Sequence, residues 1–242
     1  VGELLRLADG ALYWAKAEGR DRVVGYDPRV VRELSAAERA ERRERERAMG
    51  ALRALARAVD AKDPDTAEHS ERVAQLAEAL GRARGWPDDA LRRLREAALV
   101  HDVGKIGVPD ALLFKAGQLE PAEYRQVQAH AALGGEIASE VLDAEQACWV
   151  RHHHERFDGL GYPDRLEAEA IPEAARMLSL ADAFDVMTSV RTYKPALPVA
   201  EAIEECRRCA GGQFDPALVQ LLTRLVESGA VDVRGRPPVV TA

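Results

Sequence analysis

The 242-residue chain carries a formal charge of −7, with 47% hydrophobic and only 5% aromatic residues, which fits a folded protein of one or two domains. The acidic balance argues against binding to long nucleic acids, which requires a basic surface. No apolar run approaches the roughly 20 residues of a membrane-spanning helix, and no signal peptide is recognisable. We therefore expect a cytoplasmic protein, an expectation that covers only the segment beginning at Val1.

Long runs without Gly or Pro, rich in Ala, Leu, Arg and Glu, predict an all-α protein. The three cysteines, Cys148, Cys206 and Cys209, are an odd count in a sequence without secretory features, so we expect reduced thiols.

The first 27 residues predict one helix over 3–17 and a short strand at 22–26, which is too little for a domain. Residues 8–16 (Ala-Asp-Gly-Ala-Leu-Tyr-Trp-Ala-Lys) and 19–23 (Gly-Arg-Asp-Arg-Val) resemble the C-terminal end of a GGDEF domain, the diguanylate cyclase fold. The nucleotide-binding part of that family is absent, so no cyclase activity is expected. An ordinary amphipathic helix is the alternative interpretation.

Residues 28–50 predict a charged helical linker that is nearly devoid of large apolar side chains. Pairs such as Glu38 and Arg42, four residues apart, stabilise such a helix by only about 0.2–0.5 kcal/mol each. From Met49 onward an apolar stripe returns, so the helix should run from an exposed stalk onto a packed body. The stalk could form a homodimer or pass a signal to GGDEF-domain or other signalling proteins, and a simple linker is an equally supported alternative.

The body, residues 51–228, reads as amphipathic helices separated by Pro and Gly, and residues 229–242 form an uninformative tail. Asp215 followed by Pro216 predicts the start of the last helix, with Asp as the capping residue.

All six histidines fall between residues 69 and 154: His69, His101, His130, His152, His153 and His154. A lone histidine is more often structural than a ligand, but this concentration favours a metal site. The adjacent pair His101 and Asp102 offers an imidazole and a carboxylate to one metal, and the second carboxylate oxygen stays available for another. This pattern favours two metals bridged by Asp102.

The ordered motifs resemble the HD-GYP subgroup of the HD superfamily, the cyclic di-GMP phosphodiesterases. The match covers about residues 60–220. It includes His101-Asp102-x-Gly104-Lys105, Ile106-Gly107-Val108-Pro109-Asp110, His130-Ala131-x-x-Gly134, His153-His154-Glu155-x-x-Asp158-Gly159-x-Gly161-Tyr162-Pro163, Ala181-Asp182-Ala183-Phe184-Asp185 and Arg191-x-Tyr193-Lys194. The resemblance implies an HD-superfamily helical bundle.

The resemblance also implies two groups of metal ligands that share Asp102. The first group is His69, His101, Asp102 and Asp182, and the second is His130, His153 and His154. Imidazole-rich sites suit iron or manganese rather than magnesium, so two divalent transition metal ions are expected. Asp65 stands where some family members carry a Glu that helps to hold a third metal and others carry a non-ligand. Its side chain is one methylene shorter than Glu, and an acid at a helix start is also explained by the helix dipole. His152 lies outside the family's pair and should support a ligand or be exposed.

The activity implied by the resemblance is hydrolysis of cyclic di-GMP to pGpG, and onward to GMP as an open possibility, through a metal-bridging hydroxide with Asp102 and Lys105 as catalytic residues. Lys105 would stabilise the charge that develops on the phosphate. A salt bridge from Lys105 to a ligand carboxylate is the alternative.

Four further residues are implied to bind substrate: Gly161, Tyr162, Arg191 and Lys194. Tyr162 would stack on guanine and Gly161 would let the backbone approach closely, although a simple tight turn also uses Gly and Pro. Two alternative functions remain: a catalytically weak cyclic di-GMP receptor or adaptor, and a phosphodiesterase for another cyclic dinucleotide.

Overall fold

The computed structural model describes residues 36–61, 69–115, 117–189 and 195–231, with the side chains of 36–38 left out. These residues form helices and no strand, so the all-α prediction is confirmed for them. The predicted helix at 3–17 and strand at 22–26 lie outside them. No helix in these ranges is long and apolar enough to cross a membrane.

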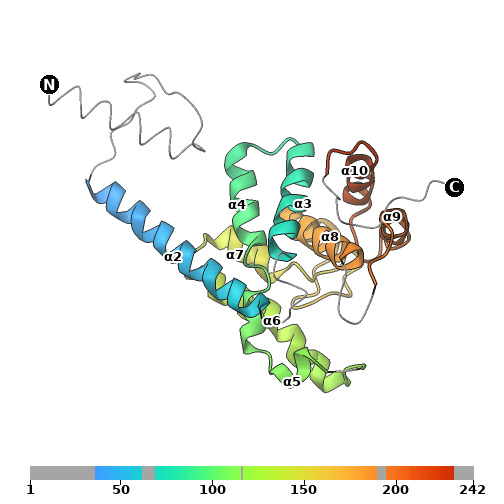
Figure 1. Ribbon diagram of the computed structural model, residues 1–242, viewed down its shortest axis with the longest axis horizontal. Helices are drawn as coiled ribbons and strands as arrows, with labels where there is room; N and C mark the ends of the chain where they lie inside the picture. The colour runs from blue at the N-terminus through green and yellow to red at the C-terminus, as the bar shows by residue number, and fades with distance from the viewer. Residues whose placement is uncertain (1–35, 62–68, 116, 190–194, 232–242) are drawn as a thin grey trace. The chain divides into compact units, whose positions relative to one another are not determined.

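The chain forms two compact units, residues 1–47 and 48–242, and every helix from α3 onward belongs to the second (Figure 1). The helices are α2 (Ala36–Asp60), α3 (His69–Ala83), α4 (Asp88–Ala98), α5 (Asp110–Leu113), α6 (Pro121–Ser139), α7 (Ala144–Arg151), α8 (Glu173–Thr188), α9 (Val199–Arg208) and α10 (Pro216–Glu227), with 3-10 turns η1 (Val103–Gly107) and η2 (Ala168–Ala170).

The core of the second unit is built around α3, which lies between α4 and α8 (Figure 1). Leu80, Leu94 and Phe184 bring these three helices together and are fully buried. Helices α9 and α10 pack on α8, while α6 packs on α7 and η1. Met49, Leu52 and Ala56 of α2 join the same core, which confirms the apolar stripe predicted after the charged segment. The three cysteines are free thiols, as predicted.

Two aspartates begin helices, as their sequence context requires. Asp215 caps α10 by accepting a hydrogen bond from the amide of Ala217, which confirms the predicted helix start. Asp143 caps α7 by accepting from the amide of Gln146, and Arg93 of α4 grips the same carboxylate through two hydrogen bonds of 2.9 and 2.8 Å. Asp143 therefore fastens the start of α7, the helix that leads into the His152–His154 run, to α4.

Replacing Asp143 by Ala should destabilise the protein by about 1 kcal/mol, the usual cost of a lost helix cap. Burial raises the pKa of Asp143, but hydrogen bonds from Arg93 and the Gln146 amide outweigh it and lower the pKa below its usual range. Its stabilisation should therefore be present above about pH 4 and be lost as the pH falls further. Urea unfolding of the wild type and of D143A at several pH values measures this. Asp88→Ala, an exposed acid that caps nothing in α4, should change stability little.

Candidate metal centre

The antiparallel pair α3 and α4 places the start of one helix beside the end of the other. His69 is the first residue of α3, and His101 follows α4 closely, so their ring centroids lie 5.5 Å apart. His130 comes from α6, and His153 and His154 follow α7. The fold thus brings five of the six histidines, from four helices or their ends, to one place.

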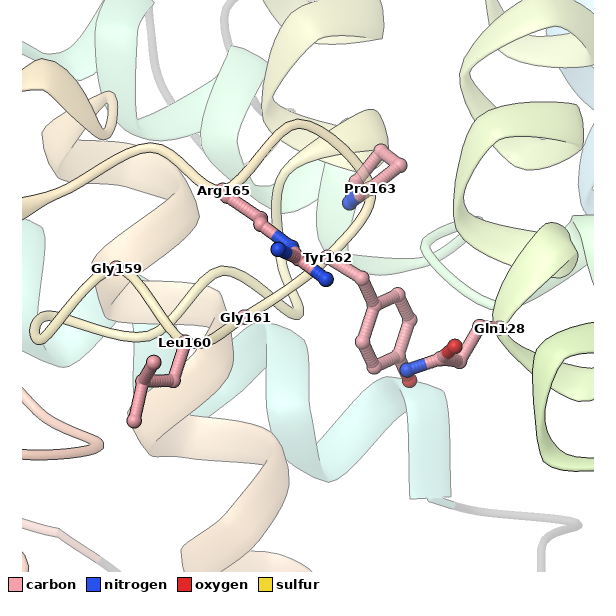
Figure 2. A pocket seen from close by; sticks show the side chains of 7 residues that line it. All are labelled: Gln128, Gly159, Leu160, Gly161, Tyr162, Pro163 and Arg165. Atoms are coloured by element: carbon pink, nitrogen blue, oxygen red, sulfur yellow. The ribbon is translucent and has the colours of Figure 1, made fainter. Parts of the chain in front are cut away.

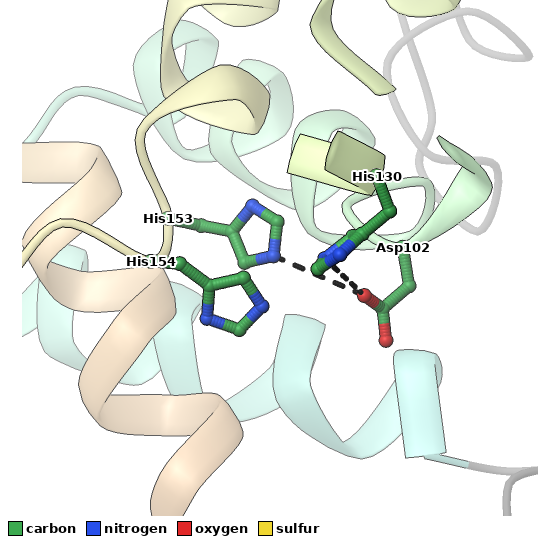
Figure 3. A group of neighbouring side chains, drawn as sticks. All are labelled: Asp102, His130, His153 and His154. Atoms are coloured by element: carbon green, nitrogen blue, oxygen red, sulfur yellow. Dashed lines mark ion pairs between the residues drawn. The ribbon is translucent and has the colours of Figure 1, made fainter. Parts of the chain in front are cut away.

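Asp102 lies between two groups of imidazoles. One group contains Asp102, His130, His153 and His154 (Figure 3), and the other contains His69, His101 and Asp102; within each, one ligand atom per residue lies within 4.8 Å of the others. The Oδ1 atom of Asp102 is 3.4 Å from Nε2 of His130 and 3.9 Å from Nε2 of His153. Its Oδ2 atom is 3.5 Å from Nε2 of His101. Each carboxylate oxygen therefore faces a different group.

Three of these histidines have their protons fixed by the backbone. His101, His130 and His153 each place Nδ1 2.5–2.7 Å from the carbonyl oxygen of the residue three positions earlier. Because a carbonyl only accepts, Nδ1 must carry the proton and Nε2 must present a lone pair. All three Nε2 atoms, together with Oδ1 of Asp102, are buried without a hydrogen-bond partner. A buried cluster of lone pairs around a carboxylate is what a divalent cation requires.

The ionisation of the group that contains Asp102, His153 and His154 agrees with that chemistry. Burial, together with the neighbouring imidazoles, lowers the pKa of His153 well below its usual range and that of His154 to about 3. Burial alone would raise the pKa of Asp102, but Lys105 and His101 lower it well below its usual range. Neutral imidazoles and an ionised carboxylate are the forms that bind metals.

His69 is held between two carboxylates of α8. Its Nδ1 lies 2.8 Å from Asp185 and its Nε2 lies 3.2 Å from Asp182. Burial opposes the charge on His69, but the hydrogen bonds to Asp182 and Asp185 raise its pKa to about 9. Arg72, one turn after His69, also donates two hydrogen bonds to Asp185. Asp185 thus orients the His69 ring, while Asp182 lies beside its Nε2.

The segment after Asp102 approaches α6 so closely that only glycine fits at position 104. A Cβ added to Gly104 would lie 2.0 Å from the carbonyl oxygen of His130 and 2.5 Å from the amide of Gly134. The motif glycine therefore sets the distance between Asp102 and His130. Next in the chain, Lys105 lies with Nζ 2.5 Å from Oδ2 of Asp102, so the salt bridge considered as an alternative for Lys105 is present in the structure.

The loop after His154 lies against the group formed by Asp102, His130, His153 and His154. The Tyr162 ring lies 4.9 Å from the ring of His154 and 6.3 Å from that of His130, centroid to centroid. Gly161 has no room for a side chain, since a Cβ there would lie 2.3 Å from the amide of Arg156. The buried carboxylate of Glu155 accepts a hydrogen bond of 2.7 Å from the amide of Asp164, which ties the far end of the loop back to its start.

Comparison with known proteins places this arrangement in a family. A family model described as "HD domain" matches residues 53–218. The chain belongs to the HD domain family. This match, together with the phosphodiesterase relatives described next, confirms the resemblance to HD-GYP phosphodiesterases that the motifs indicated.

Curated relatives of the chain are cyclic-dinucleotide phosphodiesterases by name. The chain is 42% identical over 146 residues to "3'3'-cGAMP-specific phosphodiesterase 3" of Vibrio cholerae, covering 60% of this chain and 32% of the relative. It is 36% identical over 181 residues to "Cyclic di-GMP phosphodiesterase" of Thermotoga maritima, covering 72% and 48%. The chain thus spans about a third to a half of the length of these relatives.

The fold of the HD domain agrees with a solved structure. A crystal structure of a cyclic GMP-AMP-specific phosphodiesterase of V. cholerae superposes with a TM-score of 0.58 at 21% identity, covering 78% of this chain and 54% of the other. At that identity the likeness supports the helical-bundle fold alone, and the HD domain match over residues 53–218 makes this bundle the predicted HD-superfamily fold.

Most of the predicted site residues of this HD domain lie together. The structure gathers His69, His101, Asp102, His130, His153, His154, Asp182, Lys105, Gly161 and Tyr162 around the two groups. Asp182 contacts His69 but is not within the group formed by His69, His101 and Asp102. Asp65, Arg191 and Lys194 lie outside the described residues.

His152, expected to be exposed or to support a ligand, is buried and forms a contact of its own. Its Nε2 lies 2.8 Å from Asp164, which Arg151 also grips with two hydrogen bonds. Sequence reasoning missed the roles of Glu155 and Asp164. Both flank the Gly161-Tyr162-Pro163 motif, and that position was the available signal for a loop held at its two ends.

Proposed function

We propose that this HD domain is a metal-dependent phosphodiesterase that hydrolyses cyclic di-GMP to pGpG, with GMP as a further product to be tested. The proposal rests on the Nε2 atoms of His101, His130 and His153, which are buried around Asp102 without a hydrogen-bond partner. The Asp102 carboxylate belongs to both groups of candidate ligands. The relatives named as cyclic di-GMP phosphodiesterases support the substrate class.

The residues present fit two divalent transition metal ions, and we propose iron or manganese. His130, His153 and His154 would hold one ion; His69, His101 and Asp182 would hold the other; Asp102 would bind both. When bound, the ions supply Lewis acidity and lower the pKa of water so that it can attack phosphorus. Imidazole-rich donor sets favour these metals over magnesium, and Asp65 is the candidate for a third ion.

The chain's own side chains then position and neutralise the phosphodiester. Lys105 keeps its ammonium at the cluster: burial lowers the pKa of Lys105, but Asp102 outweighs it and raises the pKa above its usual value. This proton donor would stabilise the negative charge that develops on phosphate oxygens. Tyr162 offers an aromatic face beside the cluster. Arg191 and Lys194 are the proposed phosphate or base contacts from outside the described residues.

A second substrate, 3'3'-cGAMP, is favoured by a specific observation. Three of the Vibrio cholerae relatives carry that specificity in their names, at 42%, 34% and 33% identity. Both substrates present the same phosphodiester to the metals, so the choice between them must lie in the contacts to the bases.

Product analysis tests the proposal. The chain is loaded anaerobically with iron or manganese, its metal content is measured, and it is incubated with cyclic di-GMP or 3'3'-cGAMP before chromatography. We expect linear dinucleotide or mononucleotide from samples with at least two metals per chain, and none after chelation. Nucleotide that stays intact at full metal loading would contradict the enzyme and favour a receptor or adaptor, particularly if calorimetry detects binding.

A further inference from the structure

A pocket of about 330 Å³ lies along the loop that follows His154 (Figure 2). It is lined by Gln128 of α6 and by the loop residues Gly159, Leu160, Gly161, Tyr162, Pro163 and Arg165. Sites for whole drug-sized ligands occupy about 300–1,000 Å³, and this pocket lies at the lower end of that range. It is therefore large enough for one nucleobase.

Tyr162 connects this pocket to the metal centre. The ring lines the pocket and also lies 4.9 Å from the ring of His154. A base that stacks on Tyr162 would thus lie one ring away from His154, a candidate metal ligand. Base stacking on an aromatic ring favours every base similarly, so other side chains must choose between purines.

The guanidinium of Arg165 forms no ion pair with the described residues of the neighbouring loop. Arg151 and Arg156, on the same segment, each form two hydrogen bonds to a carboxylate, Asp164 and Asp158 respectively. Among the residues described, no carboxylate lies within 4.0 Å of the Arg165 guanidinium. Arg165 is exposed and its backbone is left-handed (φ 59°), an uncommon conformation for a residue other than glycine. Its side chain turns toward Tyr162 (Figure 2).

Gln128 faces the pocket from a different element. Gln128 and Tyr162 line the same pocket, and the Arg165 side chain points toward Tyr162 from the loop (Figure 2). Gln128 is half-buried, and its side chain forms no hydrogen bond to another described residue. Its carbonyl accepts and its NH₂ group donates, so it can pair with the edge of a base.

We infer that this pocket binds a guanine of the substrate, with Arg165 as the residue that selects guanine over adenine. This inference rests on the proposed function. The guanidinium donates two hydrogen bonds to O6 and N7 of guanine, while the carbonyl of Gln128 accepts from N1–H and the N2 amino group on the other edge. Adenine places an amino group where guanine has O6, so two donors would face each other.

Cyclic di-GMP and 3'3'-cGAMP each contain at least one guanine, so both can fill the pocket and present a phosphodiester to the metals. Cyclic di-AMP contains none. The pocket therefore admits both candidate substrates and discriminates against cyclic di-AMP.

Arg165→Gln in the metal-loaded chain tests the inference, because it keeps a polar side chain and removes the charged fork. We expect kcat/KM for cyclic di-GMP and for 3'3'-cGAMP to fall about 10- to 100-fold, the range of one good bidentate base contact. GMP should also lose its advantage over AMP as a competitive inhibitor. Arg92→Gln, on the exposed face of α4, is the matched control and should change neither.

The outcomes separate the two proposals. If the wild type hydrolyses none of the three dinucleotides, the proposed function fails. If it hydrolyses cyclic di-GMP but R165Q retains both kcat/KM and the preference for GMP over AMP, the guanine pocket is wrong and the function stands. Circular dichroism of R165Q checks that the loop substitution leaves the helical fold intact.

Discussion

Asp102→Ala should lose metal binding and cyclic dinucleotide hydrolysis together. The carboxylate is the one group that belongs to both sets of histidines among the described residues, with Oδ1 facing His130 and Oδ2 facing His101. Loss of a group that merely supports a ligand costs about 10- to 100-fold in metal affinity or activity, so loss of the shared ligand should cost more than 100-fold. Metal analysis and the rate of product formation on one sample measure both effects.

The fold should survive this substitution, which keeps the result interpretable. Removing Asp102 leaves Lys105 without its partner, but about a third of the Lys105 side chain is exposed and it can turn toward water. Manganese at 100 times its dissociation constant should stabilise the wild type by about 2.7 kcal/mol in thermal unfolding, and D102A should show little of this. Asp89→Ala, an exposed acid of α4, serves as the control. A D102A protein that binds two metals and turns over normally would refute the bridging role.

The clustering of the candidate metal ligands was predictable from the sequence because these residues sit in short motifs whose spacing is fixed by local structure. His101 and Asp102 are adjacent, and His153 and His154 are adjacent, so each pair arrives at the site as a unit. The groups that surround the ligands were less predictable. Arg72 and Asp185 are separated by 113 positions and meet only because α3 packs on α8.

The pocket residues were the least predictable part. Arg165 lies outside every motif, and its usefulness depends on the absence of a carboxylate partner in three dimensions, which no sequence pattern records. Gln128 lies two residues before His130, but its direction depends on how α6 faces the loop after His154. Predicting either would have required knowing where the loop closes.

Gly104→Ala should be the most destabilising single methyl addition in this domain. The new Cβ would lie 2.0 Å from the His130 carbonyl oxygen and 2.9 Å from the Gly134 Cα, and both are backbone atoms that cannot rotate away. Overpacking of a core typically costs about 1–3 kcal/mol, and a clash with backbone on a neighbouring helix should exceed that range. Relief requires η1 and α6 to separate, which also pulls Asp102 from His130. Urea unfolding and metal content should therefore both be affected.

Gly50→Ala distinguishes this steric effect from a general effect of replacing glycine. Gly50 lies inside α2, and a Cβ there would meet nothing within 4 Å, so the same methyl group should stabilise the helix by about 0.5–1 kcal/mol. We expect the free energy of unfolding to fall in G104A and to rise in G50A, because helix propensity favours alanine at both sites while space for the methyl group exists only at Gly50. Nε2 of His130 lies 3.4 Å from Oδ1 of Asp102. If G104A unfolds at the same urea concentration as the wild type and retains its metals, the close approach of η1 to α6 does not set this distance.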